Sequence, residues 1–298
     1  MKILPFFLES RPQFLLLAVV LGILGTCIAW YEGVFELGHA ILAGFGLILA
    51  HASCNALNDY FDYQSGIDKA TTVTPFSGGS GLIKRGLLKP REVFWFGTIC
   101  LLISLPIGLY FCIVKGWLLL PLIVVAALCV IFYSPVILRF HWPEWSPGLG
   151  LGILPVLGMY FSQTGEYTWH ALIASIPSGL LVHNLLLLNE FSDIEPDKIG
   201  HRKTLPITLG RTGAAIIYAV FTLFTYAWIL GAVFLEIMPV FALLGLFTIP
   251  VAIRAVQGSF RSKDQATLMT AMAQNVVVVL VTQLLIAVGY VLSGLFGF

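Results

Sequence analysis

Long apolar stretches separated by short polar clusters make up most of the chain. Several stretches reach about 20 residues, the length at which an α-helix crosses the hydrocarbon core of a bilayer. None of them alternates in the manner of an outer-membrane strand. The pattern predicts nine membrane-spanning helices, at residues 13–30, 38–57, 92–112, 117–138, 147–164, 170–190, 211–233, 238–256 and 267–296. No small-residue cleavage site follows the first stretch, so we expect it to be retained rather than removed as a signal peptide.

The composition agrees with this all-α prediction. The chain has 298 residues, of which 58% are hydrophobic and 10% are charged, whereas roughly a quarter of the residues in a soluble domain are charged. Its five cysteines lie within or beside the apolar stretches and form no CxxC pair, so we expect buried thiols rather than a metal or disulfide site. We therefore expect one polytopic membrane domain over residues 1–298, with the lipid bilayer as its surroundings and no nucleic-acid partner.

The basic residues indicate how the predicted helices are oriented. With the N-terminus inside, nine crossings place all of the 16 Lys and Arg residues except Lys115 in cytoplasmic segments. This is the asymmetry that membrane proteins show, because Lys and Arg are enriched in cytoplasmic loops. We therefore expect the N-terminus and the two long loops, 58–91 and 190–211, on the cytoplasmic side of the cytoplasmic membrane.

The first long loop begins with a cluster of polar side chains at the end of the second predicted helix. Asn55, Asn58 or Asp59, and Asp62 follow one another at helical spacing, so their side chains are predicted to share one helix face. Gly66 separates this cluster from Asp68, and we expect the chain to turn back there, because glycine readily adopts positive φ.

The second long loop begins in a similar way at the end of the sixth predicted helix. Asn189, Asp193 and Asp197 repeat every four residues and are also predicted to share a face. Pro196 removes one backbone donor, so we expect the helix to kink or end there. Each acid alone is compatible with a solvated loop carboxylate, but two acidic faces on one side of a membrane are expected to be functional.

The side-chain chemistry of the two clusters favours a hard cation between them. Carboxylate and carboxamide oxygens suit Mg²⁺, and the clusters lack the Cys or His set that zinc prefers. Mg²⁺ usually completes its coordination with water and substrate phosphate oxygens. Cations that could bind such a phosphate follow in both loops, although they could equally serve only to set the orientation. They are Lys84, Arg85, Lys89, Arg91, Arg202 and Lys203.

Both clusters resemble the aspartate-rich motifs of a known family. NDYFDYQSGID is similar to the first motif, and NEFSDIEPD with the Lys-Thr pair after it is similar to the second motif, of the UbiA superfamily of intramembrane aromatic prenyltransferases. The resemblance extends over the whole chain, including the RPxF stretch at residues 11–14. It implies a helical bundle around a central cavity, with the aspartates at the cytoplasmic end.

Within this superfamily the chain is most similar to the branch that prenylates 1,4-dihydroxy-2-naphthoate in menaquinone synthesis. Two features carry this similarity: the longer spacing from Asp62 to Asp68 and the asparagine at position 189. The chain departs from that branch at Ser192, where an Arg is usual, and at FSGGSG, where the branch has an Arg in the loop.

The resemblance also implies roles for individual residues. The metal ligands would be Asn58, Asp59, Asp62, Asp193 and Asp197, holding Mg²⁺ ions that bind the diphosphate of a polyprenyl donor. Residues expected to bind the donor or the aromatic acceptor are Asn55, Asn189, Lys69, Lys84, Arg85, Tyr63 and Tyr133. Asp68, Arg202 and Lys203 are the candidates for catalytic chemistry. For Asp68, metal binding, the orientation of Lys69 and proton abstraction from the acceptor all stay open.

Two other functions are compatible with the sequence. A relative of the same family could use another acceptor, such as homogentisate, a tetrapyrrole or a glycerol phosphate lipid. An ion-coupled transporter could use the carboxylates to coordinate ions. The position of both clusters at helix ends speaks against a transporter, because transporter sites usually lie near the midplane.

Overall fold

The computed structural model describes residues 3–297, except for the side chains of Asp68 and Lys69. Every regular element in this part of the chain is helical, which confirms the all-α prediction. In chain order the elements are α1 (Ile3–Glu9), α2 (Pro12–Tyr31), α3 (Leu37–Ser65), α4 (Ile67–Ala70), α5 (Pro90–Val114), η1 (Trp117–Leu119), α6 (Leu120–Phe132), η2 (Ile137–Arg139), α7 (Trp145–Gly148), η3 (Leu149–Ile153), α8 (Leu154–Thr164), α9 (Trp169–Ile199), α10 (Leu205–Thr208), α11 (Gly210–Phe234), η4 (Val240–Thr248), α12 (Ile249–Phe260) and α13 (Gln265–Phe296).

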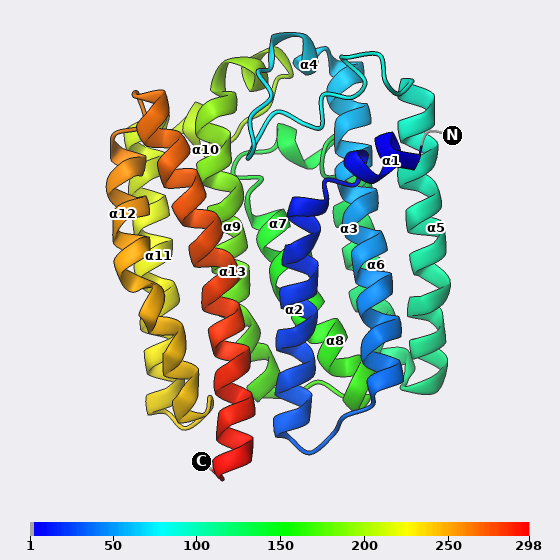
Figure 1. Ribbon diagram of the computed structural model, residues 1–298, viewed down its shortest axis with the longest axis vertical. Helices are drawn as coiled ribbons and strands as arrows, with labels where there is room; N and C mark the ends of the chain where they lie inside the picture. Colours follow the sequence, from blue (N-terminus) through cyan, green and yellow to red (C-terminus); the bar gives the residue numbers. More distant parts are fainter. Residues whose placement is uncertain (1–2, 298) are drawn as a thin grey trace.

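The long helices stand side by side in one bundle (Figure 1). Within the described residues, seven helices are long and apolar enough to cross a membrane, namely α2, α3, α5, α9, α11, the continuous pair η4 and α12, and α13. Many of their large apolar side chains are exposed, including Leu223, Phe234 and Phe247. An apolar outer face of this kind is what a bilayer requires, so the protein is an integral membrane protein.

Two of the nine predicted spans are built from shorter helices. Residues 117–132 form η1 and α6, and residues 145–164 form α7, the π-helical turn η3, and α8. Glycines allow η3 to lie directly against α9, because a Cβ atom on Gly152 would be 2.6 Å from the Cα atom of Gly179. Small residues at helix contacts are typical of membrane bundles. The count of nine crossings stays a prediction.

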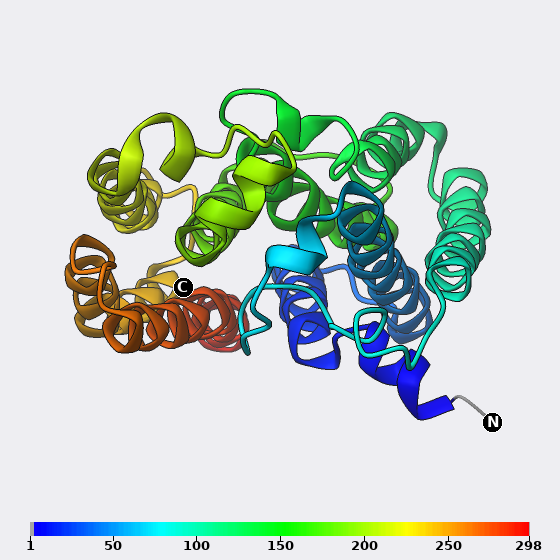
Figure 2. The ribbon, with the colours of Figure 1, turned by 90° about the horizontal axis from the view of Figure 1, so that it is seen from above.

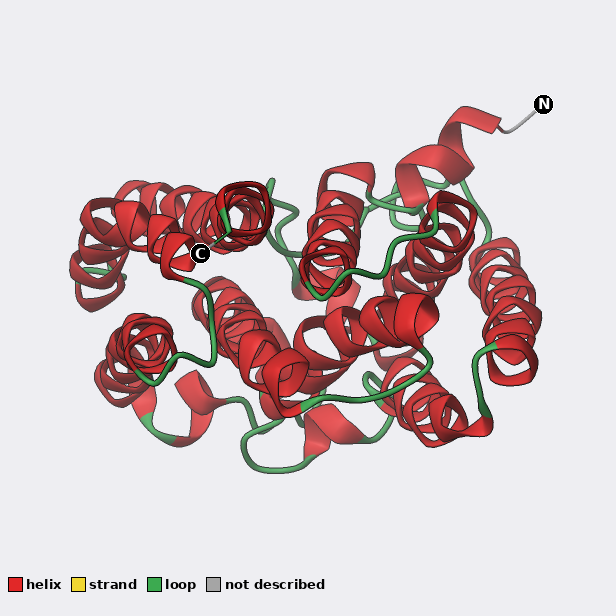
Figure 3. Cartoon of the chain, turned by 90° about the horizontal axis from the view of Figure 1, so that it is seen from below, coloured by secondary structure: helices red, strands yellow, loops and turns green. Residues whose placement is uncertain are grey.

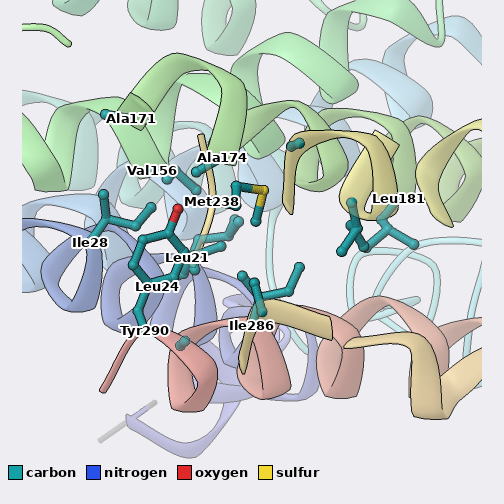
Figure 4. Close-up of a cluster of buried hydrophobic side chains, with 14 of the residues drawn as sticks. Leu21, Leu24, Ile28, Val156, Ala171, Ala174, Leu181, Met238, Ile286 and Tyr290 are labelled. Atoms are coloured by element: carbon teal, nitrogen blue, oxygen red, sulfur yellow. The ribbon is translucent and has the colours of Figure 1, made fainter. Parts of the chain in front are cut away.

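The main core lies where α2, α8, α9 and α13 meet. Leu21, Leu24 and Ile28 of α2 are fully buried and pack with Val156 of α8 and Tyr290 of α13 (Figure 4). Close packing of this kind holds membrane helices together, because lipid tails are as apolar as the side chains themselves. Ala171, Ala174 and Leu181 of α9 belong to the same core, which therefore fixes α9, the helix of the second acidic cluster, against α2.

Short helices and connecting segments gather at the end of the bundle where both acidic clusters lie. Seen from above, α4 and the segment after it cross over the long helices (Figure 2), whereas in the view from below connecting loops join the ends of neighbouring helices (Figure 3). Gly66 ends α3 with φ of 79°, which confirms the predicted turn. The chain then brings α4 onto α9, where a Cβ atom on Gly200 would meet the side chain of Ile67 at 2.2 Å.

The helix of the sixth predicted span, 170–190, extends further than that span, and of the two alternatives expected at Pro196, a kink or an end, the helix does not end there. Helix α9 continues to Ile199 with Pro177 and Pro196 inside it. Both aspartates of the second cluster therefore lie on one helix. Proline removes a single backbone donor, and a helix fixed by tertiary packing can continue through that loss.

Candidate functional site

The two acidic clusters lie beside one pocket at the same end of the bundle. The pocket encloses about 340 Å³, which is within the range of small-molecule sites. Its other walls are mainly apolar and come from α2, α3, α5, α6, α8, α9 and α13. The charged and carboxamide residues in its lining are Arg11, Gln13, Asn55, Asn58, Asp62, Asn189, Glu190, Asp193, Asp197 and Arg202.

The first cluster divides between the pocket and the segment above it. Asn58 and Asp62, one helical turn apart, line the pocket. Asp59 is rotated away from them by the helix and is 3% exposed. Its carboxylate binds the guanidinium of Arg11 and accepts a hydrogen bond of 2.7 Å from the backbone N–H of Ser80. Asp59 therefore connects α3 to the chain before α2 and to residues 71–89, the segment between α4 and α5. This segment, part of which lines the pocket, is called the covering segment below.

The second cluster faces the same pocket from α9. Asp193 and Asp197 both line it, as predicted from their spacing. Ser192 donates a hydrogen bond to the backbone carbonyl of Asn189 at 2.8 Å, and its hydroxyl lies 2.7 Å from that of Ser77. Ser192, which departs from the naphthoate branch, therefore joins α9 to the segment over the pocket.

Arg202 lies between the two clusters. Its Nη1 donates to Asp197 Oδ1 at 2.8 Å, and its Nη2 binds the carboxylate of Asp62. All three side chains are largely buried, with Arg202 11% exposed. Like charges at this proximity are unfavourable without a positive partner. The guanidinium supplies that partner and joins α3 to the end of α9.

The charges of this cluster shift the pKa values of ionisable groups that lie outside the long helices. Burial alone would lower the pKa of Arg202, but the charges of Asp62 and Asp197 outweigh burial and raise it. Burial would also lower the pKa of Arg11, but the nearby carboxylates, Asp59 first among them, outweigh burial and raise it. Burial and then the charge of Asp59 raise the pKa of Glu9 to about 8. Both arginines are therefore held in the charged form.

The acidic residues fit a magnesium ion that shares its coordination with a substrate. No group of three or more Asp, Glu, His or Cys side chains within the described residues could hold a metal by itself. Asn189 has a buried Oδ1 atom without a hydrogen-bond partner in this part of the chain, and it lines the pocket. Carboxylate and carboxamide oxygens are the ligands that Mg²⁺ prefers, and Mg²⁺ typically takes one or two carboxylates and completes its shell with phosphate and water.

Some of the predicted site residues do not reach the pocket. Tyr63 is 40% exposed, because the turn of α3 that points Asp62 inward points its neighbour outward. Lys84 donates to the carbonyl of Thr71 at 3.0 Å, and Arg85 donates to the carbonyl of Ser80 at 3.1 Å. Both cations therefore brace the covering segment instead of lining the pocket.

Of the remaining predicted residues, two line the pocket and one lies outside it. Lys203 is exposed and outside the pocket, and its backbone N–H donates to the carbonyl of Leu138. Tyr133 lines the pocket. Asn55 also lines it and donates to the carbonyl of Ser10 at 3.0 Å. The side chains of Asp68 and Lys69 lie outside the described part of the structure, so only their place in α4 is known.

Sequence reasoning missed several residues of the site. Arg11 appeared only as part of the RPxF stretch, yet it binds Asp59. Glu9 is fully buried and accepts a hydrogen bond of 2.8 Å from the hydroxyl of Ser80. Glu190 lies within the second motif and is buried in the pocket wall. A charged residue next to a membrane span was the available signal for each of these acids and for Arg11.

Known proteins resemble this chain over most of its length. A 1,4-dihydroxy-2-naphthoate octaprenyltransferase from Bacillus subtilis is 27% identical over 266 residues, covering 88% of this chain and 84% of that protein. A digeranylgeranylglyceryl phosphate synthase from Thermococcus kodakarensis is 29% identical over 277 residues, covering 88% and 89%.

The fold is shared with solved structures as well. A UbiA homologue from Archaeoglobus fulgidus, bound to GPP and Mg²⁺, superposes with a TM-score of 0.61 at 15% sequence identity, covering 97% of this chain and all of that one. The model of the UbiA prenyltransferase family matches residues 15–280. This match includes both acidic clusters, Arg202 and the helices that surround the pocket. The chain therefore belongs to the UbiA prenyltransferase family.

Proposed function

We propose that this prenyltransferase moves a polyprenyl group from a polyprenyl diphosphate to an aromatic acceptor, 1,4-dihydroxy-2-naphthoate, in menaquinone biosynthesis. The observation that carries the proposal is the position of two acidic faces at one end of a mainly apolar pocket. A polyprenyl diphosphate has the same division into a charged head and an apolar tail. The naphthoate octaprenyltransferase from Bacillus subtilis supports the choice of acceptor.

The donor would lie with its diphosphate between α3 and α9. Of the five predicted ligands, Asn58, Asp62, Asp193 and Asp197 line the pocket and would hold Mg²⁺ there, whereas Asp59 would act beside them through its ion pair with Arg11. When bound, Mg²⁺ neutralises negative charge on the departing diphosphate and so favours cleavage of the allylic C–O bond. Arg11 and Arg202 add fixed positive charge beside the same oxygens, because both line the pocket.

The polyprenyl tail would occupy the apolar part of the pocket. Its lining there includes Phe14, Leu101, Phe111, Leu122 and Leu154. These side chains exclude water from the reacting carbon, and aromatic faces stabilise a nearby cation. Exclusion of water favours transfer to the acceptor over hydrolysis.

Nine crossings and an inside N-terminus fit the same picture. The N-terminal and C-terminal ends of the chain lie at opposite ends of the bundle (Figure 1), as an odd number of crossings requires. The basic residues then gather on the side that holds the site, which the positive-inside rule makes cytoplasmic. Diphosphate and acceptor would both reach the site from the cytoplasm.

A glycerol phosphate lipid is the second candidate acceptor. The digeranylgeranylglyceryl phosphate synthase from Thermococcus kodakarensis supports it, as does Ser192 at a position where the naphthoate branch usually has an Arg. The two acceptors give products of different mass, so one assay separates them. Purified protein is incubated with Mg²⁺, geranylgeranyl or farnesyl diphosphate and each acceptor, and the lipid products are read by mass spectrometry.

Substitutions in the two acidic clusters test the assignment of the site. We expect Asp59→Ala, Asp62→Ala and Asp193→Ala each to abolish transfer while the protein stays folded in the membrane. Glu195→Ala is the matched control, because Glu195 lies on the same helix as Asp193 but its side chain is 79% exposed. Full Mg²⁺-dependent activity in all three variants would contradict the site. Ion flux that ignores prenyl diphosphates, in reconstituted vesicles, would favour a transporter instead.

A further inference from the structure

Glu190 is a buried acid in the pocket wall that has no place in the scheme above. It is 7% exposed, and neither carboxylate oxygen has a hydrogen-bond donor among residues 3–297. The side chain of Glu144 lies behind it, within hydrogen-bonding range of Glu190. Glu144 is fully buried and accepts a hydrogen bond of 2.7 Å from the backbone N–H of Leu205, while its other oxygen has no donor in the same part of the chain.

The position of Glu190 relates it to the second acidic cluster. Glu190, Asp193 and Asp197 follow one another at helical spacing and all three line the pocket. With about 1.5 Å of rise per residue, Glu190 lies ~4.5 Å below Asp193 along α9. This is one turn further from the expected diphosphate oxygens, at the depth where the allylic carbon of the donor would lie. The hydroxyl of Tyr133 and the guanidinium of Arg202 act on Glu190 electrostatically without a hydrogen bond to it.

An unpaired buried carboxylate is costly, and the chemistry of the cavity limits what can pair with it. Burying a polar group without a hydrogen bond costs roughly 1–3 kcal/mol in proteins, and an unpaired charge costs more. The diphosphate and the prenyl tail cannot supply the donor, because one is an anion and the other is apolar. A proton shared with Glu144 can satisfy one oxygen of Glu190, and among the ligands proposed for the pocket a hydroxyl group of the acceptor is the one with an acidic proton to donate to the other.

We propose that Glu190 binds the hydroxyl group of the acceptor and takes its proton, with Glu144 as the positioning residue behind it. The proposal rests on the proposed function. As the hydroxyl proton moves to a Glu190 oxygen, its electron pair drives a ring carbon to form a C–C bond with the allylic carbon. The C–O bond to diphosphate breaks, and its electron pair leaves with the diphosphate. The ring carbon next to the hydroxyl then releases the carboxylate that it carries as CO₂, and the electron pair of that bond restores the aromatic ring while Glu190 returns its proton to the oxygen.

The central test is Glu190→Gln, which keeps the size of the side chain but cannot accept the proton. We expect transfer to fall roughly 10²- to 10⁴-fold, as for loss of a general base. We expect no change in Mg²⁺-dependent binding of a non-cleavable prenyl thiolodiphosphate. We also expect a larger share of prenyl alcohol among the products, because the donor still ionises and water replaces the acceptor. Glu190→Asp, which keeps a carboxylate, should recover part of the transfer.

Control variants separate this role from a structural one. Glu195→Gln makes the same chemical change on an exposed residue of the same helix and should leave transfer and product ratio unchanged. Glu144→Gln should raise the KM for the acceptor more than it lowers kcat, since it acts only through Glu190.

Three results would overturn the inference. The first is transfer by Glu190→Gln at the wild-type rate. The second is a loss of Mg²⁺ or donor binding in that variant, which would make Glu190 part of the diphosphate site. The third is a fall in activity with an unchanged ratio of prenyl alcohol to product, which would indicate a structural role. Failure of the proposed function is distinct, because wild-type protein would then transfer the prenyl group to no acceptor.

Discussion

Arg202 is the side chain whose removal tests the architecture of the site most directly. Its guanidinium binds Asp62 on α3 and Asp197 on α9, with 2.8 Å between its Nη1 and Asp197 Oδ1. Arg202→Met retains a long unbranched side chain and removes the charge. It leaves two largely buried carboxylates, 13% and 3% exposed, without their shared partner.

The size of the effect follows from this burial. Breaking a buried ion pair by removing one partner costs about 3–5 kcal/mol, because an uncompensated charge stays inside the protein. Unfolding entropy is about 2.1 cal/mol/K per residue, which for 298 residues gives ~0.6 kcal/mol/K. The melting temperature in detergent without divalent cations should therefore fall by about 5 to 8 °C.

Lys198→Met is the matched control for this experiment. Lys198 lies near the end of α9, the helix that carries Asp197. It pairs with Glu195 at 2.8 Å, but the two side chains are 51% and 79% exposed. Exposed pairs contribute about 0–1 kcal/mol, so its melting temperature should change by less than about 2 °C. Saturating Mg²⁺ should restore more stability to Arg202→Met than to wild type, since it can pair with the released carboxylates. Equal melting temperatures for the two variants would refute the reasoning.

Two further predictions concern the segment that covers the pocket. Burial, together with the charge of Asp59, raises the pKa of Glu9 from 4.5 to about 8, so folding favours its protonated form, and this contribution to stability is lost as the pH rises through about 8. Glu9→Gln, which cannot ionise, should therefore flatten the decline in thermal stability between pH 5 and 9, and an unchanged profile would contradict this. Gly79→Ala should weaken binding of the prenyl thiolodiphosphate several-fold, because its Cβ atom would lie 3.0 Å from Asp59 Oδ1. Gly86→Ala, also at positive φ but with open space around it, should bind as tightly as wild type, and equal losses in both would assign the effect to backbone strain alone.

Local patterns in the sequence were sufficient for the helices and for the acidic faces. Hydrophobic length alone predicted the long helices, because a membrane span must satisfy its own backbone hydrogen bonds. Helical spacing alone placed Asn58 with Asp62, and Asp193 with Asp197, on the pocket side of their helices. These results depend on contacts within one element, which the order of residues determines directly.

Contacts between distant segments could not be predicted in the same way. Arg11 and Asp59 are separated by 48 residues, and Arg202 and Asp62 by 140. Their pairing depends on how α2, α3 and α9 pack against one another. The spacing of charges along the sequence does not predict that packing. Glu144 stands in a short segment that resembled a loop, and only the packing of that segment against α9 buries it beside Glu190.

The arginines also change the interpretation of the two acidic faces. The sequence suggested that a cation from outside must separate them, but the chain provides cations of its own. Four carboxylates, at Asp59, Asp62, Asp193 and Asp197, are opposed by only two guanidiniums, so the formal charge of the cluster is four minus two, or −2. An incoming diphosphate increases this negative charge. Because like charges at close range are unfavourable, the arginines can hold the site together before the donor arrives, but a divalent cation is still needed when the donor binds.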